Sequence, residues 1–268
     1  MTARSTFTIS DSVRDVLARS TITATSVALP EQLDRKLYTE VNKALAGAGG
    51  KWSRKDKAHI FDRDPREVLG LAVETGKATN VRTKLQAFYT PGPLAARMVS
   101  AASMALLPRA GQAIRMLEPS IGEGALAKAA ANAWAAKYKL TVIGYDIDPI
   151  ALQKSKDHLH VVEHALLDCQ DFLSVDHGET FDVVLMNPPF SGGADIVHVT
   201  HAWKFVRPGG ALVAIMSPRF QHASTKAAIA FRGLLESLGV RAETEDIEPG
   251  TFEHTGVATV LVLMRKPG

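Results

Sequence analysis

The sequence has a single cysteine, Cys169, among its 268 residues. One thiol cannot form an internal disulfide or a thiolate cluster, so we expect a cytoplasmic protein with no structural metal. The sequence also has no apolar run near the roughly 20 residues that a membrane span requires, and its first 20 residues lack the apolar core of a targeting peptide. These absences argue against a secreted disulfide scaffold and against any membrane partner.

A strong excess of one charge is absent too, since the net charge is +3. The charge is nevertheless uneven: residues 1–86 carry 15 Lys and Arg against 10 Asp and Glu, whereas residues 87–268 carry 16 against 18. A basic segment beside a nearly neutral body suits an anionic polymer as partner, although an ordinary solvated surface explains such a bias equally well.

Hydrophobic residues make up 46% of the chain and charged residues 22%, which is enough to bury a core. Without repeats or low-complexity tracts, we expect one main domain over residues 87–268 and a basic, mainly helical extension over residues 1–86. Amphipathic patterns predict helices in that extension over residues 10–19 and 30–46, the second with Pro30 and Glu31 in its first turn.

A glycine-rich turn ends the second of these helices, and four basic residues then surround Trp52. An aromatic ring among cations can stack on a base or lie against a sugar-phosphate chain, whereas a lone Trp after a glycine turn is as often a hydrophobic plug. The extension is therefore a candidate for DNA binding or dimerisation. The candidate nucleic-acid-binding residues are Lys51, Trp52, Arg54, Lys55 and Lys57.

From residue 87 onward, short apolar runs alternate with longer helical patterns, which is typical of an α/β fold with a parallel sheet. The predicted strands are 114–117, 140–145, 181–186 and 211–216, and the predicted helices are 125–138, 148–159, 194–206 and 224–238. Two closing strands, 240–246 and 257–264, have no helix between them. They predict a terminal antiparallel pair on an otherwise parallel sheet.

A glycine turn follows the first of these strands, in the segment Glu118-Pro119-Ser120-Ile121-Gly122-Glu123-Gly124. It lies at the carboxyl edge of the sheet, where open α/β folds bind ligands, and its glycines allow backbone to approach a ligand closely. The turn lacks the third glycine of the dinucleotide fingerprint, and an acid at the strand end disfavours a phosphate.

Two acids further along complete a candidate nucleoside site. Asp146 ends the next strand, where a carboxylate can accept hydrogen bonds from ribose hydroxyls. Asp171, beside Phe172, suits an adenine amino group under an apolar cover, with a helix cap or turn residue as the alternative.

The tetrapeptide Asn187-Pro188-Pro189-Phe190 directly follows the apolar strand 181–186. An exocyclic amine on a base is a poor nucleophile because its lone pair is delocalised into the ring. Two oxygens that accept both of its protons, from the Asn187 side chain and the Pro188 carbonyl, would localise that lone pair and stabilise the developing positive charge. The prolines fix the direction of the carbonyl, and Phe190 can stack on a planar base.

The chain resembles the S-adenosylmethionine-dependent DNA adenine-N6 methyltransferases of the gamma group, over residues 87–265. The resemblance rests on the order of Phe88-Tyr89-Thr90-Pro91, the glycine turn and the Asn187 tetrapeptide. It implies a Rossmann-like class I methyltransferase fold with a mostly parallel seven-stranded sheet, S-adenosylmethionine (SAM) as cofactor and DNA as substrate. It also implies that Phe252 stacks on the other face of a flipped base.

The same resemblance implies which residues contact the cofactor: residues 88–91 at the methionine end, Glu118 and the glycines at the amino acid portion, Asp146 at the ribose and Asp171 with Phe172 at the adenine. The implied cofactor-binding residues are Phe88, Tyr89, Thr90, Pro91, Glu118, Pro119, Ser120, Gly122, Gly124, Asp146, Ile147, Asp171, Phe172 and Asn187. The implied catalytic residues are Asn187, Pro188, Pro189 and Phe190.

The sequence departs from this group because no long DNA-reading domain follows the last predicted strand. We therefore expect little sequence specificity, or a separate specificity or restriction partner, with a homodimer as a further possibility. Adenine-N6 methylation of RNA, methylation of a protein glutamine and a non-catalytic SAM-binding anti-restriction protein are the alternatives that the motifs leave open.

Overall fold

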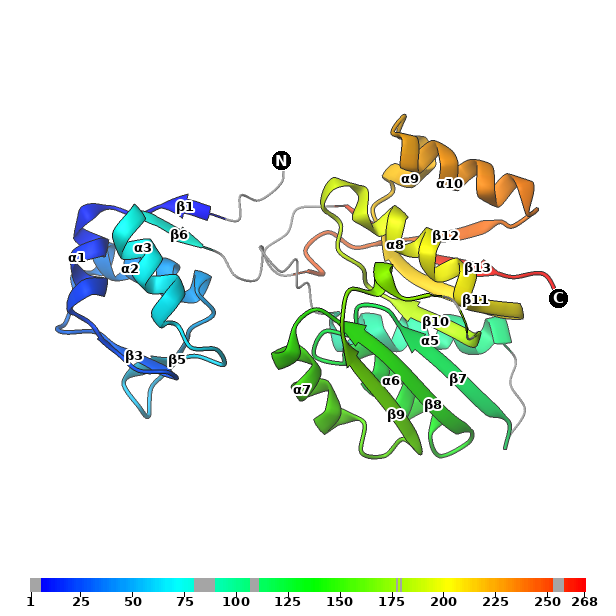
Figure 1. Cartoon of the computed structure of the whole chain (residues 1–268), viewed down its shortest axis with the longest axis horizontal. Coiled ribbons are helices and arrows are strands. Elements are labelled where there is room, and N and C mark those ends of the chain that lie inside the picture. The colour runs from blue at the N-terminus through cyan, green and yellow to red at the C-terminus, as the bar shows by residue number, and fades with distance from the viewer. Residues whose placement is uncertain (1–5, 80–89, 107–110, 177, 179, 253–257) are drawn as a thin grey trace. The chain divides into compact units, whose positions relative to one another are not determined.

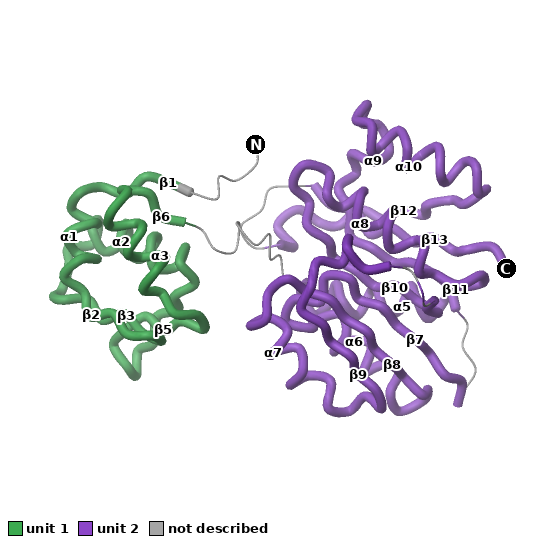
Figure 2. Tube along the Cα trace, in the orientation of Figure 1, with its two compact units in different colours: residues 1–87 green, residues 88–268 purple. Residues whose placement is uncertain are grey.

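The computed structural model describes residues 6–79, 90–106, 111–176, 178, 180–252 and 258–268. The chain divides into two compact units, residues 1–87 and residues 88–268 (Figure 2). No helix within the described ranges is both long enough and apolar enough to cross a membrane.

Unit 1 contains helices and short strands. In chain order these are β1 Thr6–Thr8, α1 Asp11–Arg19, β2 Thr21–Ile22, β3 Ser26–Ala28, α2 Arg35–Gly47, β4 Lys51–Ser53, β5 Ala58–Ile60, α3 Arg66–Thr75 and β6 Lys77–Thr79. The first predicted helix is present as α1. The second begins later than predicted, because the Asp34 side chain caps α2 by accepting from the backbone N–H groups of Lys36 (2.9 Å) and Leu37 (3.1 Å). Pro30 and Glu31 therefore precede the helix.

The strands of unit 1 were missed by the sequence analysis, so the description "mainly helical" was incomplete. Four of them form a sheet in the order β2-β3-β5-β4, and β1 pairs with β6. Each has only two or three residues, which is too short for an alternating pattern to show in sequence. Leu17, Val41 and Leu69, one from each helix, meet in the core of this unit.

Unit 2 alternates strands and helices along the chain (Figure 1). Its strands are β7 Ala113–Glu118, β8 Lys139–Asp146, β9 His164–Cys169, β10 Phe181–Met186, β11 Val206–Met216, β12 Ala242–Ile247 and β13 Thr259–Arg265. Its α-helices are α5 Gly92–Leu106, α6 Ala125–Trp134, α7 Pro149–His158, α8 Ala194–Ala202, α9 Arg219–His222 and α10 Lys226–Ser237. Short 3-10 turns are η1 Phe172–Ser174, η2 Ser191–Gly193 and η3 Trp203–Phe205.

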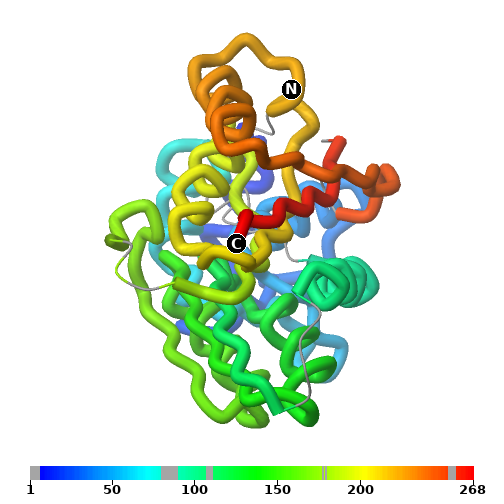
Figure 3. The backbone as a smooth tube through the Cα atoms, turned by 90° about the vertical axis from the view of Figure 1, so that its right-hand side faces the viewer, coloured from blue at the N-terminus to red at the C-terminus, as the bar shows by residue number. Residues whose placement is uncertain are grey.

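Within the described residues of unit 2, seven strands form one sheet in the order β12-β13-β11-β10-β7-β8-β9. The five strands from β7 to β11 run parallel, whereas β13, red in Figure 3, runs antiparallel between β11 and β12. The predicted Rossmann-like class I fold, with its terminal antiparallel pair, is confirmed. Strand β9 was not predicted, because most of its side chains are exposed at the sheet edge and it lacks an apolar run.

Helices cover both faces of this sheet (Figure 1). Side chains alternate along each strand, so that Met116 of β7 belongs to the core cluster that includes residues of α5 and α6, and Leu117 belongs to the cluster on the other face that includes residues of α8 and α10. Strands buried on both faces read as continuous apolar runs, as 183–186 does in β10. The strand order reverses between β7 and β10: β8 and β9 lie beyond β7, and β11 lies beyond β10. Open α/β sheets bind ligands beside such a switch point, at the carboxyl ends of the strands.

Candidate active site

Three neighbouring strands of unit 2 end in polar side chains at the carboxyl edge of the sheet. Glu118 is the last residue of β7, Asp146 is the last residue of β8, and Asn187 directly follows β10. Because β10, β7 and β8 are adjacent and parallel, these residues lie at one edge, as the sequence predicts.

The turn after β7 has a backbone that needs glycine. Gly122 and Gly124 have φ of 54° and 82°, a region that residues with a side chain rarely adopt. A Cβ on Gly124 would also lie 3.1 Å from Cα, Cβ and Oγ of Ser155 in α7. The buried Ser155 hydroxyl donates to the Gly122 carbonyl at 2.6 Å, so α7 holds the turn in place.

The carboxylate of Asp146 accepts hydrogen bonds from the backbone of two different segments, the glycine turn and the start of α7. Its Oδ2 accepts from the N–H of Gly122 at 2.8 Å, and its Oδ1 accepts from the N–H of Asp148 at 2.9 Å. A carboxylate at the end of this strand is of the type that accepts hydrogen bonds from ribose hydroxyls. Asp148 in turn caps α7 by accepting from the N–H of Ile150 at 3.0 Å.

Glu118 is deeply buried at this edge, with 2% of its surface exposed. Burial, and to a lesser degree the nearby charge of Asp146, raises its pKa well above the ordinary 4.5, although a hydrogen bond from the backbone N–H of Ala127 acts in the opposite direction. Its Oε2 is buried and has no hydrogen-bond partner within the described residues. A cationic ligand group would satisfy such an oxygen.

Ile147, predicted to bind the cofactor, and the two residues predicted at its adenine, Asp171 and Phe172, lie in different surroundings. Ile147 is 59% exposed directly after β8, so its side chain is open to a ligand ring. Asp171 is exposed and caps η1, accepting from the N–H of Leu173 at 3.0 Å, in agreement with the alternative interpretation as a helix cap. The Phe172 ring is buried against Tyr145 and His201, so it does not provide an exposed cover for an adenine.

Asn187 contacts the segment that the sequence analysis assigned to the methionine end of the cofactor. Its Nδ2 donates to Oγ1 of the buried Thr90 at 3.1 Å. Phe88 and Tyr89 lie outside the described residues, whereas Thr90 and Pro91 lie within them. Because the amide nitrogen points to Thr90, the amide oxygen is directed away from it.

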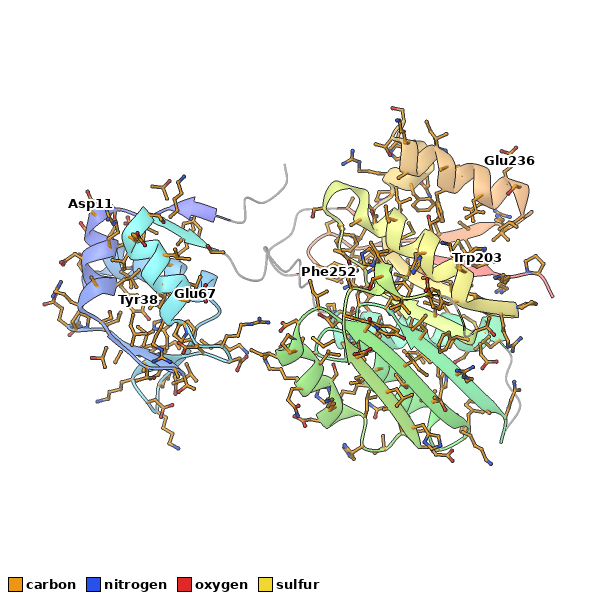
Figure 4. The ribbon with its side chains drawn as sticks, viewed as in Figure 1. Asp11, Tyr38, Glu67, Trp203, Glu236 and Phe252 are labelled. Atoms are coloured by element: carbon orange, nitrogen blue, oxygen red, sulfur yellow. The ribbon has the colours of Figure 1, made fainter. Side chains whose placement is uncertain are left out.

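The two aromatic residues predicted to hold the base are in contact with each other. The rings of Phe190 and Phe252 have centroids 6.4 Å apart at 67°, an edge-to-face pair. Both are buried, and the Phe252 side chain lies toward the carboxyl ends of the parallel strands, whereas Trp203 lies toward their amino ends (Figure 4). In this arrangement the two rings leave no room for a base between them.

Two polar contacts at this edge were missed by the sequence analysis. One is the Ser155 bond to the glycine turn. The other is the buried Asp195 in the first turn of α8, whose Oδ2 accepts from the N–H of Ser217 at 2.8 Å and so joins the residue after β11 to the segment that follows Phe190. An acid in a first helical turn is too common to reveal such a role in sequence.

The model of the methyltransferase small domain family matches residues 86–245. The chain belongs to this family. Its members use SAM as methyl donor, and the site fits that cofactor, because Glu118 and Asp146 with a glycine turn suit a ligand that carries an ammonium group and a ribose. The described part of the chain contains no group of three or more His, Cys, Asp or Glu side chains that could hold a metal ion.

Solved structures show the same fold. The chain is similar to the methyltransferase subunit of a type I restriction-modification system from Streptococcus thermophilus (20% identity, TM-score 0.56, 74% of this chain and 49% of that chain). It is also similar to a protein from Vibrio vulnificus YJ016 assigned as a modification subunit of a type I restriction enzyme (17%, 0.58, 87% and 53%). A third, from Listeria monocytogenes, is assigned as a class I SAM-dependent methyltransferase (11%, 0.57, 96% and 79%).

The chain spans about half the length of the first two of these structures. Identities this low show a shared fold and leave the substrate open. A search of curated proteins finds no match to the sequence. The family match places the chain among SAM-dependent methyltransferases.

Proposed function

We propose that this methyltransferase transfers a methyl group from SAM to the N6 amine of adenine in DNA. One contact carries most weight: Asn187 Nδ2 donates to Thr90 Oγ1 at 3.1 Å, at the end of β10. With the nitrogen held there, the amide oxygen, which is buried, would accept from a substrate amine that enters beside Glu118 and Asp146 on the neighbouring strands.

In this proposal the Asn187 side-chain oxygen and the Pro188 carbonyl accept the two N–H groups of the adenine amine. Both bonds strengthen as positive charge develops on the nitrogen, so they stabilise the transition state more than the bound substrate. Pro188 and Pro189 restrict the backbone that carries the carbonyl. When bound, SAM supplies an electrophilic methyl group, so we expect no covalent enzyme intermediate.

The cofactor would be held by the acids and the turn of the same edge. We assign Glu118 to the ammonium group, Asp146 to the ribose hydroxyls and the Thr90 hydroxyl to the carboxylate, since a hydroxyl that accepts from Asn187 still has a hydrogen to donate. The exposed Ile147 side chain would lie against the adenine ring, and Asp171 would accept from its amino group.

Phe190 and Phe252 would hold the target base after it leaves the DNA stack. Because the two rings are in contact with each other, at least one must turn aside to admit a base. Such a rearrangement on binding is compatible with the edge-to-face contact, which is worth only about 0.5–1.5 kcal/mol beyond the area it buries.

We propose DNA as the substrate because of the tetrapeptide that begins at Asn187. The two similar proteins assigned to type I restriction-modification support this proposal. By the same analogy, a specificity or restriction partner on another chain is part of the proposal, as is weak sequence preference of the chain alone.

The test uses the full chain with isotope-labelled SAM and, separately, plasmid DNA, RNA and a protein extract. We expect label in DNA, and N6-methyladenine as the modified nucleoside after digestion. Label mainly in RNA or in protein glutamine would reject the proposal. Sequencing the methylated adenines tests the expected weak preference, which a single recurring motif of several bases would contradict.

A further inference from the structure

A β-hairpin of unit 1 presents the basic segment that the sequence analysis singled out. Strands β4 and β5 pair antiparallel, with Trp52 opposite His59 and Ser53 opposite Ala58, and residues 54–57 form the turn between them. Strand β4 is the last strand of its sheet, so the hairpin has a free side along β4 within the described part of unit 1.

The turn carries an excess of positive charge. Arg54, Lys55 and Lys57 are exposed, and no described acid forms an ion pair with any of them. The one acid of the turn, Asp56, accepts from the Ser53 hydroxyl at 2.6 Å, which holds it toward the strand. Lys51 lies 3.8 Å from Asp62 and is compensated, so the uncompensated charge is at the tip.

Trp52 is fixed from one side and open on the other. Its ring meets that of His59 edge-to-face at 5.1 Å, and 45% of the residue remains exposed. The buried His59 ring is in turn hydrogen-bonded through Nε2 to Oδ1 of Asn42 in α2, at 2.9 Å. The aromatic side chain is thus held in position instead of folding into the core.

The base of the hairpin is closely packed. A Cβ on Gly50, directly before β4, would lie 2.6 Å from Cζ of the buried Phe61, so backbone and ring are in close contact there. Close packing at this end supports the backbone of the hairpin, so that binding needs mainly the ordering of the exposed side chains at the tip.

We propose that this hairpin docks the protein on DNA: Arg54, Lys55 and Lys57 contact phosphates, and Trp52 packs against the adjoining deoxyribose. A two-stranded ribbon has the dimensions to enter the major groove of a duplex. The choice of DNA over other polyanions rests on the proposed function, whereas the docking surface rests on the hairpin itself. Its contacts add affinity without reading sequence, because phosphates carry no sequence information directly.

The test measures binding of the full chain to a fluorescent DNA duplex by anisotropy, without SAM, across about 50–200 mM salt. The slope of log affinity against log salt is negative, and each lost phosphate contact reduces its magnitude by about 0.9. We therefore expect a reduction of about 2.7 in the triple variant Arg54→Gln, Lys55→Gln, Lys57→Gln. At the lowest salt we expect its affinity to fall roughly tenfold or more. Lys55→Gln alone, expected to lower the slope by about 0.9, serves if the triple variant is unstable.

The matched control is Arg35→Gln, Lys36→Gln, Lys77→Gln, which removes the same charges from exposed positions of unit 1 outside the hairpin. We expect its slope to stay near that of the unmodified protein. Equal losses in the two triple variants would show that net charge, not the hairpin, governs binding, and an unchanged slope in the hairpin variants would overturn the proposal. Trp52→Ser is expected to weaken binding without changing the slope.

The two proposals fail separately. Hairpin-dependent binding to DNA without adenine methylation would reject the proposed function and leave the docking surface standing. Adenine methylation by a protein whose DNA binding ignores the hairpin would reject the docking surface alone. Tighter, hairpin-dependent binding to an RNA duplex of the same length would overturn the assignment to DNA.

Discussion

The proposed cofactor half and the proposed substrate half of the site are built differently. In the cofactor half, side chains of Asp146 and Ser155 bond directly to the backbone of the glycine turn. In the substrate half, Asn187 is bonded to another side chain, and Phe190 rests on Phe252 through an aromatic contact. Hydrogen bonds to backbone hold the first half in place, whereas the second half contains two rings that would have to separate to admit a base in the proposed function. Substitutions in the two halves should therefore act on different measured quantities.

The largest expected effect is that of Asn187→Ala. Loss of one preorganised hydrogen-bonding group that acts on developing charge lowers the rate constant about 10²- to 10³-fold. SAM affinity should remain within about threefold of the unmodified protein, because the cofactor half keeps its own backbone contacts. Single-turnover methyl transfer and calorimetric SAM binding measure the two quantities. A variant that keeps most of its activity would contradict the role of Asn187. A variant that loses SAM binding would contradict the expectation that the two halves act on different measured quantities.

Glu118→Gln should weaken SAM binding by about 10- to 100-fold, the range for a hydrogen bond to a charged group. The effect depends on pH. Without ligand, burial raises the pKa of Glu118, so its contribution to folding stability is present below about pH 4.5 and is lost as the pH rises through the higher folded-state pKa.

A bound ammonium group favours the ionised carboxylate, so SAM affinity of the unmodified protein should rise with pH over the same window above about 4.5. The Gln variant lacks the ionisable group and should show a flatter profile. Calorimetry across the window compares the two proteins, and parallel profiles would remove Glu118 from the ammonium site.

Much of this edge could be predicted from sequence because its residues are tied to local patterns. Glu118, Asp146 and Asn187 each end or follow an apolar strand, and the ends of parallel strands meet at one edge. Ser155 and Asp195 could not be predicted, since each is defined by a partner far along the chain, Gly122 or Ser217.

The same limit applied elsewhere in the fold. Strand β9 escaped prediction because a solvent-exposed edge strand shows little apolar pattern. The start of α2 was misplaced because Pro30 and Glu31 were expected in its first turn, whereas Asp34 caps the helix. The contact between Phe190 and Phe252 joins segments 62 residues apart, and no local pattern indicates that the rings touch.

Gly124→Ala should weaken SAM binding by roughly tenfold, because a left-handed conformation costs a residue with a side chain about 1–2 kcal/mol and the new Cβ would crowd Ser155. Folding stability should fall as well. The control is Gly233→Ala in the interior of α10, where a Cβ meets nothing within 4 Å and is expected to stabilise the helix by about 0.5–1 kcal/mol. Thermal unfolding with and without SAM measures both. Equal SAM-induced stabilisation of Gly124→Ala and the unmodified protein would show that the turn tolerates the extra carbon.

The smallest effect, and the one that bears most directly on the substrate half, is that of Phe252→Leu. If the ring stacks on the target base, its loss should raise the KM for DNA by about 2- to 12-fold, the equivalent of an aromatic contact worth about 0.5–1.5 kcal/mol, with SAM affinity unchanged. If Phe252 only supports the core, the substitution should lower folding stability and leave the KM for DNA unchanged. Phe231→Leu is the matched control, because that buried ring in α10 also makes an edge-to-face contact, with Phe220 at 5.7 Å, in the core cluster on the opposite face of the sheet. Similar losses of folding stability in the two variants, with the KM for DNA raised only in Phe252→Leu, would support stacking of Phe252 on the base. An unchanged KM in both variants would assign Phe252 to the core and leave Phe190 as the sole stacking residue of the proposal.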